Sequence, residues 1–558
     1  MFIFRRFMWI FILILSLGAM VSCFGGDDDD DDSADAIGDD DDGGDDDGGD
    51  DDGGDDDGWD DDADDDMDDD VDDDGWDDDW EDDDWDDDTI DDDSIDDDTT
   101  EEPAWECPLE QEPLVLWLSA DDSNSQASPV ISRFYIESGR IVPRWQVRTY
   151  EFTNYYQIEY EPPVPGRIKI VPQLREMENS DYESGREYVL QIGAQSHRIN
   201  AGEGRHVNLT FSLDTSGSMG DGAIHLLKDV CKAIATQLKD GDIVSMVEWS
   251  DSTSVPLNSH MVAGPNDPTL LDAIDDLSAD GSTDLHGGLV RAYELAEDNY
   301  RDGWLNRVVL ISDGGANTGI TDINIISQAA DDSEGEGIYL IGVGVDSSPG
   351  DYRDELMDDV TDAGKGAYIF VGSKEEADTQ FMERFQENME LAAMDVQVRL
   401  EMPWYMLMKE FHGEEYNPNP DEVEPQHLGP NDAMVFHQFI IACDGQTVSG
   451  EDIIKVRAEY TDPFTRVEKQ DQKTMTIAEL LAADADQLLK GNAIVAYAEA
   501  LKEIDRLIDD GLGQAALTLC QTTKDTVQNA AIALGDAELE EIAELLGDYE
   551  STVGSFAH

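Results

Sequence analysis

The sequence predicts an α/β fold: a doubly wound, mainly parallel sheet over residues 206–393, flanked by β-rich segments and followed by a helical region at the C-terminus. Two observations lead to this prediction. Short apolar runs alternate with amphipathic helical patterns through 206–393, and strands separated by helices form a parallel sheet with both faces covered. Downstream, apolar and polar residues first alternate with the period of a strand and then repeat with the period of a helix.

The elements follow in order along the chain. In the parallel sheet, we expect strands at 206–213, 242–249, 308–312, 338–345 and 367–371. We expect its helices at 223–238, 270–277, 285–300, 322–331, 352–363 and 375–394. Upstream, the pattern predicts helices at 128–137 and 144–156 and strands at 167–171 and 188–192. Downstream, it predicts antiparallel strands at 395–402, 434–442 and 453–460 and helices at 477–509 and 514–546.

Acidic residues dominate the composition: Asp and Glu number 133 against 33 Lys and Arg, for a net charge of −100 in 558 residues. Residues 27–98 hold 47 Asp and Glu81 without a Lys or Arg, and the rest of the chain is acidic as well. Nucleic acid and anionic lipid head groups need a cationic surface, so both are excluded as partners. The Asp-rich tract predicts an extended spacer, because its charges repel and it has little apolar surface to bury. Weak, multi-site Ca²⁺ binding is the alternative for this tract.

The first residues resemble an export signal. Arg5 and Arg6 precede an apolar run of 15 residues (7–21), shorter than the roughly 20 residues needed to span a bilayer. The run ends at Cys23 in a pattern similar to a bacterial lipobox, in which the Cys becomes the lipidated first residue of the mature chain. Residue 24 is Phe rather than Asp, which by resemblance to the Gram-negative sorting rule favours the outer membrane. We therefore expect an exported protein, anchored to the cell envelope through lipid at Cys23, with an ordinary signal peptide or an uncleaved anchor as the alternatives.

Three polar clusters lie in loops of the predicted parallel sheet. They read DTSGS (214–218), GSTD (281–284) and DG (313–314), and the first and third directly follow strands. The carboxyl ends of parallel strands meet at one edge, which is where such sheets bind ligands. Each cluster alone could be a helix cap or a turn. Together and in this order they resemble the metal-ion-dependent adhesion site of von Willebrand factor A domains.

That resemblance implies a divalent-cation site. Ser216, Ser218 and Thr283 would offer hydroxyls to the ion, and Asp214 and Asp313 would lie at or just outside its ligand shell and hold hydroxyls and waters in place. Mg²⁺ is the expected ion because it takes oxygen ligands in an octahedron and keeps several waters, with Mn²⁺ or Ca²⁺ as alternatives. Few direct charges leave the ion with residual positive charge and an open position. A Glu or Asp of a protein partner would complete its coordination.

The flanks resemble those of bacterial secreted or lipidated von Willebrand factor A proteins, in which a segment with the motif EFTNY (151–155) precedes the A domain and a C-terminal domain of unknown function follows it. The expected organisation is a signal peptide at 1–22, a lipidated N-terminus with the Asp-rich spacer at 23–104, an N-terminal flanking segment at 105–205, the A domain at 206–393, a β-rich domain at 394–476 and a helical region at 477–558.

No arrangement of residues predicts catalysis, because the sequence lacks HExxH, a GxSxG elbow and a phosphate-binding Gly-rich loop. We therefore expect a binding protein rather than an enzyme, one that holds an extracytoplasmic protein partner through its metal site. A metal-dependent hydrolase and a Ca²⁺-binding structural envelope protein are the alternatives. Besides Cys23, four cysteines (Cys107, Cys231, Cys443 and Cys520) leave the disulfide pairing open. Cys231 lies on the apolar face of a helix, which favours a buried thiol.

Overall fold

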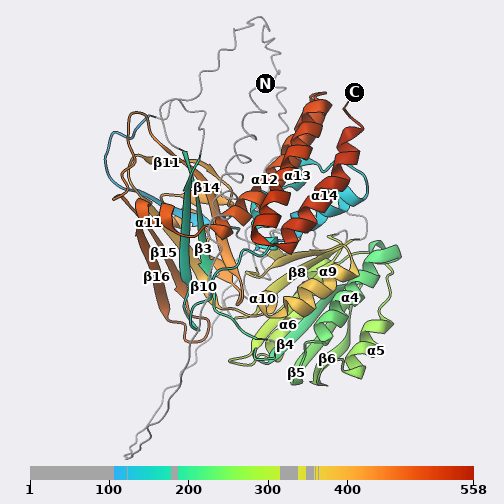
Figure 1. Ribbon diagram of the computed structural model, residues 1–558. Coiled ribbons are helices and arrows are strands. Elements are labelled where there is room, and N and C mark those ends of the chain that lie inside the picture. Colours follow the sequence, from blue (N-terminus) through green and yellow to red (C-terminus); the bar gives the residue numbers. More distant parts are fainter. Residues whose placement is uncertain are drawn as a thin grey trace, which may run out of the picture. The chain divides into compact units, whose positions relative to one another are not determined.

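The computed structural model describes residues 106–121, 124–177, 187–200, 202–314, 337–346, 357, 360–361 and 364–557. This part of the chain contains a mainly parallel sheet, two antiparallel sheets and a group of C-terminal helices (Figure 1). Cys23, the Asp-rich tract, the predicted helix at 322–331 and most of that at 352–363 lie outside the described residues. Within those residues, no helix has the length and apolar character needed to cross a membrane.

The mainly parallel sheet has six strands in the order β6-β5-β4-β7-β8-β9. Its parallel strands are β4 (Val207–Asp214), β5 (Asp240–Trp249), β7 (Leu305–Ser312), β8 (Tyr339–Val345) and β9 (Tyr368–Val371). All five agree with the predicted strands, and β4, β7, β8 and β9 are buried along their whole length. The sixth, β6 (Thr253–Ala263), runs antiparallel to β5 at the edge and was not predicted.

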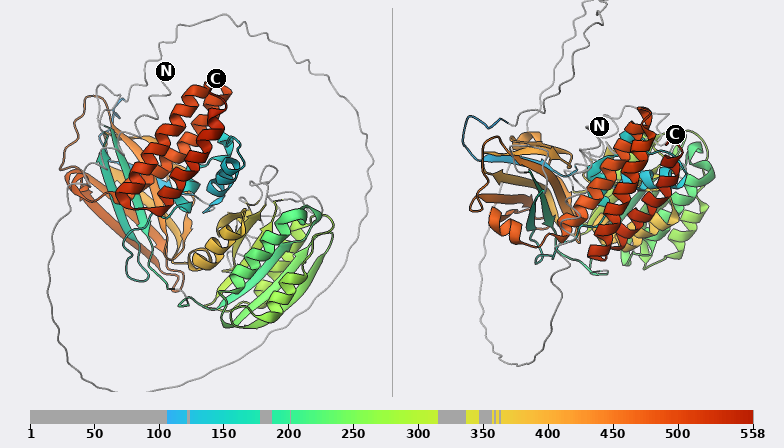
Figure 2. Two further views of the ribbon diagram at one scale, coloured as in Figure 1. Left: turned by 45° about the vertical axis from the view of Figure 1, so that its right-hand side comes forward. Right: turned by 45° about the horizontal axis from the view of Figure 1, so that its top comes forward.

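Helices cover both faces of this sheet (Figure 2). The bounds are α4 (Ala223–Ala235), α5 (Pro268–Asp276), α6 (Leu285–Asp298), α9 (Lys374–Asp378) and α10 (Phe385–Met389), with a π-helical turn at Thr379–Glu383. Helices α4, α5 and α9 share one apolar core with the sheet, and α6 shares the other. The single helix predicted at 375–394 is wrong: the π turn interrupts it, and the next strand already begins at Ala393.

The two antiparallel sheets enclose a third apolar core. One has the order β12-β1-β10-β15-β16, with β13 also paired to β10, and the other has the order β11-β14-β3-β2. The bounds of the first sheet are β1 (Leu114–Ser119), β10 (Ala393–Met402), β12 (Glu415–Asn417), β13 (Gln426–Leu428), β15 (Ile453–Thr461) and β16 (Glu468–Thr476). Those of the second are β2 (Lys169–Glu176), β3 (Glu187–Gln195), β11 (Met406–Phe411) and β14 (Ala433–Ala442). Because β1 pairs with β10 and β3 with β14, the segments before and after the parallel sheet build one sandwich.

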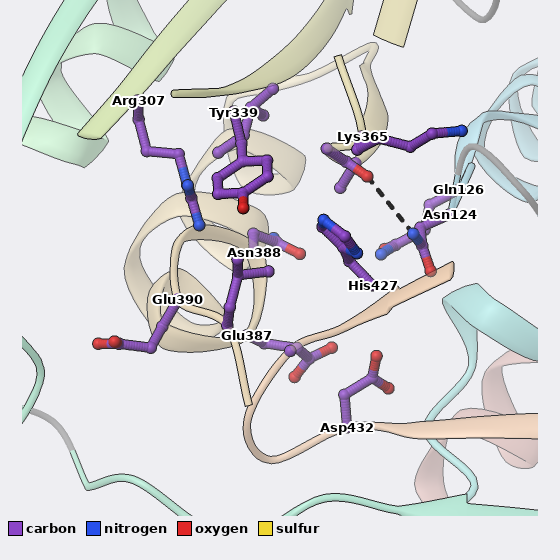
Figure 3. A pocket seen from close by; sticks show the side chains of 15 residues that line it. Asn124, Gln126, Arg307, Tyr339, Lys365, Glu387, Asn388, Glu390, His427 and Asp432 are labelled. Atoms are coloured by element: carbon purple, nitrogen blue, oxygen red, sulfur yellow. Dashed lines mark hydrogen bonds between the residues drawn. The ribbon is translucent and has the colours of Figure 1, made fainter. Parts of the chain in front are cut away.

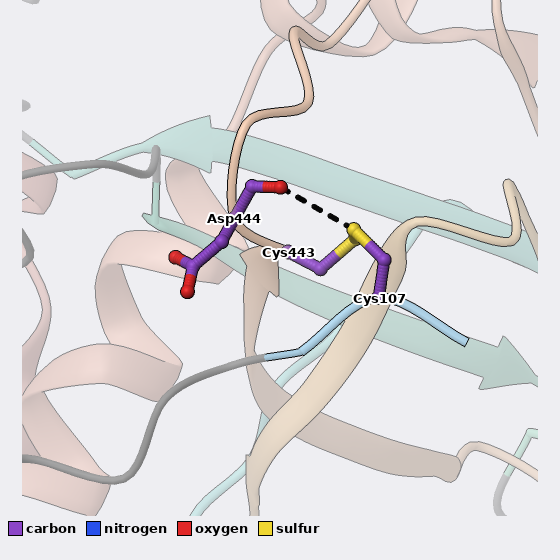
Figure 4. The surroundings of a disulfide bond; sticks show 3 residues. All are labelled: Cys107, Cys443 and Asp444. Carbon is purple, nitrogen blue, oxygen red and sulfur yellow. Dashed lines mark hydrogen bonds between the residues drawn. A yellow bond between two sulfur atoms is a disulfide. The ribbon is translucent and has the colours of Figure 1, made fainter. Parts of the chain in front are cut away.

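A disulfide closes this sandwich. Cys107 bonds to Cys443 across 336 residues of chain, so the loop that it closes contains the whole parallel sheet (Figure 4). Cys231 and Cys520 are free and buried. Burial raises the pKa of the Cys520 thiol to about 12, and both free thiols lie in apolar surroundings that make them inert.

The remaining helices flank the sandwich and the parallel sheet. Their bounds are α2 (Ala127–Glu137), α3 (Thr149–Tyr155), α11 (Ile477–Ala482), α12 (Asp486–Asp509), α13 (Gly513–Leu534) and α14 (Ala537–Gly554), with a 3₁₀ turn at Arg144–Gln146. The predicted helices at 144–156, 477–509 and 514–546 are each split in two. Gly535 ends α13 in the left-handed conformation (φ 64°), which glycine adopts without steric cost. Helix α12 packs on α3, where the rings of Phe152 and Tyr497 meet edge to face at 5.4 Å.

Candidate metal site

The carboxyl ends of β4 and β7 lie next to each other, because these strands are parallel neighbours with Leu213 in register with Ile311. Asp214 is the last residue of β4, and Asp313 directly follows β7. The strand pairing therefore brings these two carboxylates to the same edge of the sheet, as the sequence predicted.

Asp214 is fully buried and held by neutral donors. The backbone N–H of Ser216 donates to one carboxylate oxygen at 2.9 Å, and the Ser312 hydroxyl donates to the other at 2.7 Å. Burial and the negative charge of Asp313 raise the pKa of Asp214, the hydrogen bonds from Ser216 and Ser312 lower it, and the resulting pKa is about 7. This buried carboxylate thus lies close to a second carboxylate, which is an environment that a divalent cation would neutralise.

Two hydroxyls lie beside Asp214 on the loop that leaves β4. The Oγ atoms of Ser216 and Ser218 are 2.9 Å apart. Ser216 is buried whereas Ser218 is exposed, so the pair leads from the strand end to the protein surface. A hydroxyl pair shares one proton in its hydrogen bond and leaves further lone pairs to accept from or coordinate a ligand.

The loop that carries Thr283 is tied to the Ser216 loop by backbone hydrogen bonds. Gly217 N donates to Gly281 O at 2.9 Å, and Asp280 N donates to Thr215 O at 2.8 Å. The approach is close enough that a Cβ on Gly217 would lie 3.0 Å from Gly281 O, a contact that side chains rarely make. Thr283, two residues beyond Gly281, is buried. The glycine at 217 therefore allows the two hydroxyl-bearing loops to meet.

The same loop is fixed on its outer side. The Ser282 backbone N–H donates to a carboxylate oxygen of Asp251 at 2.8 Å, and the Ser282 hydroxyl bonds to the same oxygen. Asp284 caps the start of α6 by accepting from Gly287 N at 3.1 Å. Each neighbour of Thr283 thus has a structural partner of its own, which sets the position of the threonine between them.

The donor set fits a hard divalent cation. Carboxylate and hydroxyl oxygens are the ligands of Mg²⁺, Mn²⁺ and Ca²⁺. The described residues hold no group of three or more His, Cys, Asp or Glu side chains that could bind a metal by themselves. A cation at this edge would therefore depend on the serine and threonine hydroxyls as well as on the two aspartates.

The structure joins Asp214, Ser216 and Ser218 by direct hydrogen bonds and places Asp313 within electrostatic reach of Asp214. Thr283 reaches the same edge through its loop. Sequence reasoning missed Ser312, whose hydroxyl fixes Asp214 and also accepts from Gly314 N at 3.1 Å. A serine as the last residue of a strand, directly before the Asp-Gly pair, was the available signal.

Comparisons with known proteins find a similar domain family. The family model of the von Willebrand factor type A domain matches residues 208–384. A curated relative, the uncharacterized protein YfbK of Escherichia coli (strain K12), is 27% identical over 297 residues, which are 52% of this chain and 50% of that protein. The chain thus spans about half the length of the curated relative that it matches.

The similar solved structures have lower sequence identity to this chain than the curated relative has. A von Willebrand factor type A protein from Catenulispora acidiphila is 15% identical, with a TM-score of 0.42, over 68% of this chain and 90% of its own. The ArnB paralog VWA2 from Sulfolobus acidocaldarius is 16% identical, with a TM-score of 0.35, over 69% of this chain and 98% of its own. Proximal thread matrix protein 1 from the mussel byssus, solved with a zinc-occupied MIDAS motif, is 16% identical, with a TM-score of 0.28, over 33% of this chain and 48% of its own.

Proposed function

Residues 208–384 are a von Willebrand factor type A domain, and from this premise we propose that the chain is a lipid-anchored protein of the cell envelope that binds an extracytoplasmic protein partner through a divalent cation. Domains of this family commonly bind such an ion at a metal-ion-dependent adhesion site. The observation that carries the proposal is the meeting of Asp214 with the Ser216–Ser218 hydroxyl pair at the ends of β4 and β7. Mg²⁺ is the proposed ion.

Each residue has a defined part in this proposal. The hydrogen bonds from Ser216 N and Ser312 orient the Asp214 carboxylate, so it is held in place before a ligand arrives. Ser218 is exposed and gives the site its opening to solvent. When bound, the cation supplies a positive charge that a carboxylate of the partner can approach. Thr283 would add a third hydroxyl from the neighbouring loop.

The charge of the chain makes this binding metal-dependent. With a net charge of −100, the chain repels an acidic partner except where a cation is held. An acidic side chain of the partner is therefore attracted to the bound cation and repelled elsewhere. We propose binding and not catalysis, because the sequence carries none of the catalytic motifs HExxH, GxSxG or a phosphate-binding Gly-rich loop.

The test is capture of envelope proteins by immobilised full-length chain with Mg²⁺ or with EDTA. We expect a defined partner that is retained only with Mg²⁺ and is lost with Asp214→Asn. Asp284→Asn is the matched control, because asparagine caps a helix about as well as aspartate and the residue adjoins Thr283 without belonging to the motif. Capture that is equal with and without metal, or equal for Asp214→Asn, would contradict the proposal.

A further inference from the structure

A cavity of about 370 Å³ lies at the amino ends of β7 and β8, opposite the strand ends that carry Asp214 and Asp313. Its lining combines arginine side chains with aromatic rings from four segments of the chain: Arg205, Trp304 and Arg307, Tyr339, and Phe464 and Arg466. The volume is within the range of about 300–1,000 Å³ that is usual for small-molecule sites. The residue types and the size both point to a ligand rather than to unfilled packing.

Arg307 is buried at the wall of this cavity, with 3% of its surface exposed. It donates from Nε to Met389 O at 3.0 Å and from Nη1 to Asn306 O at 3.3 Å, and its guanidinium lies 5.0 Å from the centre of the Tyr339 ring. Burial and, to a smaller extent, the nearby charge of Arg205 lower the pKa of Arg307 to about 10, while the charge of Glu390 acts in the opposite direction. The group stays charged at neutral pH, held by carbonyls and a ring instead of by a carboxylate.

Positive charge in this cavity exceeds negative charge. Arg205 is paired with Glu390 and lies 4.5 Å from the ring of Phe464. Within the described part of the chain, Arg307 and Arg466 form no ion pair, and Asp302, which is exposed, is the carboxylate of the lining. Acidic residues outnumber basic ones four to one in this chain. Arg307 and Arg466 therefore leave positive charge in this cavity that a bound anion would pair with.

A smaller cavity of about 50 Å³ shares Arg307 and Tyr339 with the first. Figure 3 shows these two side chains together with the His427 ring at this second cavity. Burial lowers the pKa of His427 to about 3, so the ring is neutral. Its Nδ1 accepts from Asp395 N at 3.3 Å, which leaves the proton on Nε2, and that buried nitrogen has no hydrogen-bond partner in the described residues. Because Glu387, Glu390 and Asp432 also line this smaller cavity, its charge does not favour an anion, and the ligand site is the larger cavity.

We propose that the larger cavity, in which cationic side chains outnumber carboxylates, binds a small aromatic oxyanion, a ring that carries a carboxylate or a phosphate group. The planar guanidinium groups of Arg307 and Arg466 match the oxygens of either group. Phe464, which is 55% exposed at the rim, and Trp304 offer faces for the ligand ring. The site is separate from the metal edge, so binding does not need a divalent cation.

Calorimetry on the full chain with benzoate and with phenyl phosphate tests this assignment and distinguishes the two head groups. We expect at least one of them to bind with a Kd of about 1 mM or lower. Benzyl alcohol, which lacks the charge, and acetate and inorganic phosphate, which lack the ring, should bind at least about tenfold more weakly. EDTA and Asp214→Asn should leave binding unchanged, which separates this result from that of the adhesion site.

Substitutions locate the binding. Arg466→Gln, at an exposed position, should weaken binding of the preferred probe about tenfold or more without changing the melting temperature, since a charged hydrogen bond to the ligand is lost. Arg198→Gln is the matched control, because Arg198 is also exposed and pairs with Glu159 outside the cavity. Equal affinities for wild type and Arg466→Gln, or equal binding of benzyl alcohol and benzoate, would overturn the assignment. So would binding of acidic peptides with no binding of either small anion.

Discussion

Reduction of the Cys107–Cys443 disulfide should destabilise the β-sandwich strongly. The bond closes a loop of 336 residues, and the loop-entropy relation gives about 6 kcal/mol of stabilisation for a loop of that length at 25 °C. Measured effects usually fall below this value, so we expect about 3–5 kcal/mol. The bond joins the segment before β1 to the chain just after β14, one from each sheet of the sandwich.

Urea unfolding followed by tryptophan fluorescence measures this effect, because Trp117 lies in β1 and Trp404 follows β10. With a urea m value of roughly 3 kcal/mol/M, the midpoint of the sandwich transition should fall by roughly 1–2 M when reductant is added. The control is the double variant Cys107→Ser/Cys443→Ser, whose midpoint should be low already and should not respond to reductant. A wild-type midpoint that is the same with and without reductant would refute the reasoning.

Three further predictions address packing, protonation and export. Gly288→Ala should lower the free energy of unfolding in urea by about 1–3 kcal/mol, because the added Cβ would lie 2.1 Å from the Trp249 ring. Gly547→Ala is the control: a Cβ has room there, so this helical substitution should be neutral or stabilising. Burial and the neighbouring Asp432 raise the pKa of Glu387 to about 8, so the folded chain keeps a proton that the unfolded chain releases near pH 4.5. The free energy of unfolding of wild type should therefore fall between pH 5 and pH 8, and Glu387→Gln should reduce that fall by roughly 1–3 kcal/mol. If the free energy of unfolding depends on pH in the same way for both proteins, the prediction is wrong. Labelled palmitate should enter wild type and not Cys23→Ser, and equal labelling of the two would exclude acylation at Cys23.

The sequence was sufficient to predict the strands of the parallel sheet that are fully buried. Strands β4, β7 and β8 are buried on both faces. The sequence reveals β7 and β8 by apolar runs such as VVLI and YLIGVGV, and β4 (VNLTFSLD) by alternating apolar residues. Strand β6 was missed because most of its residues are exposed at the sheet edge, and β16 was missed because its sequence, EKQDQKTMT, is polar throughout. Both strands are defined by their pairing with a neighbour, which local periodicity does not record.

Pairing between segments far apart in the sequence explains the remaining differences between the predicted and the observed structure. The sandwich forms only when β1 meets β10 and β3 meets β14, partners more than 200 residues apart in sequence, and no local pattern links them. At the candidate site, the motif residues could be proposed because their three clusters, in this order, resemble the adhesion site of von Willebrand factor A domains. Ser312 was missed although it directly precedes the Asp-Gly pair, because a strand-end serine gains its role only once β7 lies beside Asp214.

The measurement that tests the central claim most directly is calorimetry of Mg²⁺ and Mn²⁺ binding to the full chain and three variants. We expect one site in wild type, and loss of about tenfold or more in affinity for Asp214→Asn and for Thr283→Ala, since each would remove an oxygen group that holds the ion or its waters. Asp284→Asn should bind as wild type does. If Asp214→Asn binds the ion as tightly as wild type, the ion is not held at the ends of β4 and β7, and the adhesion function proposed from that site is wrong.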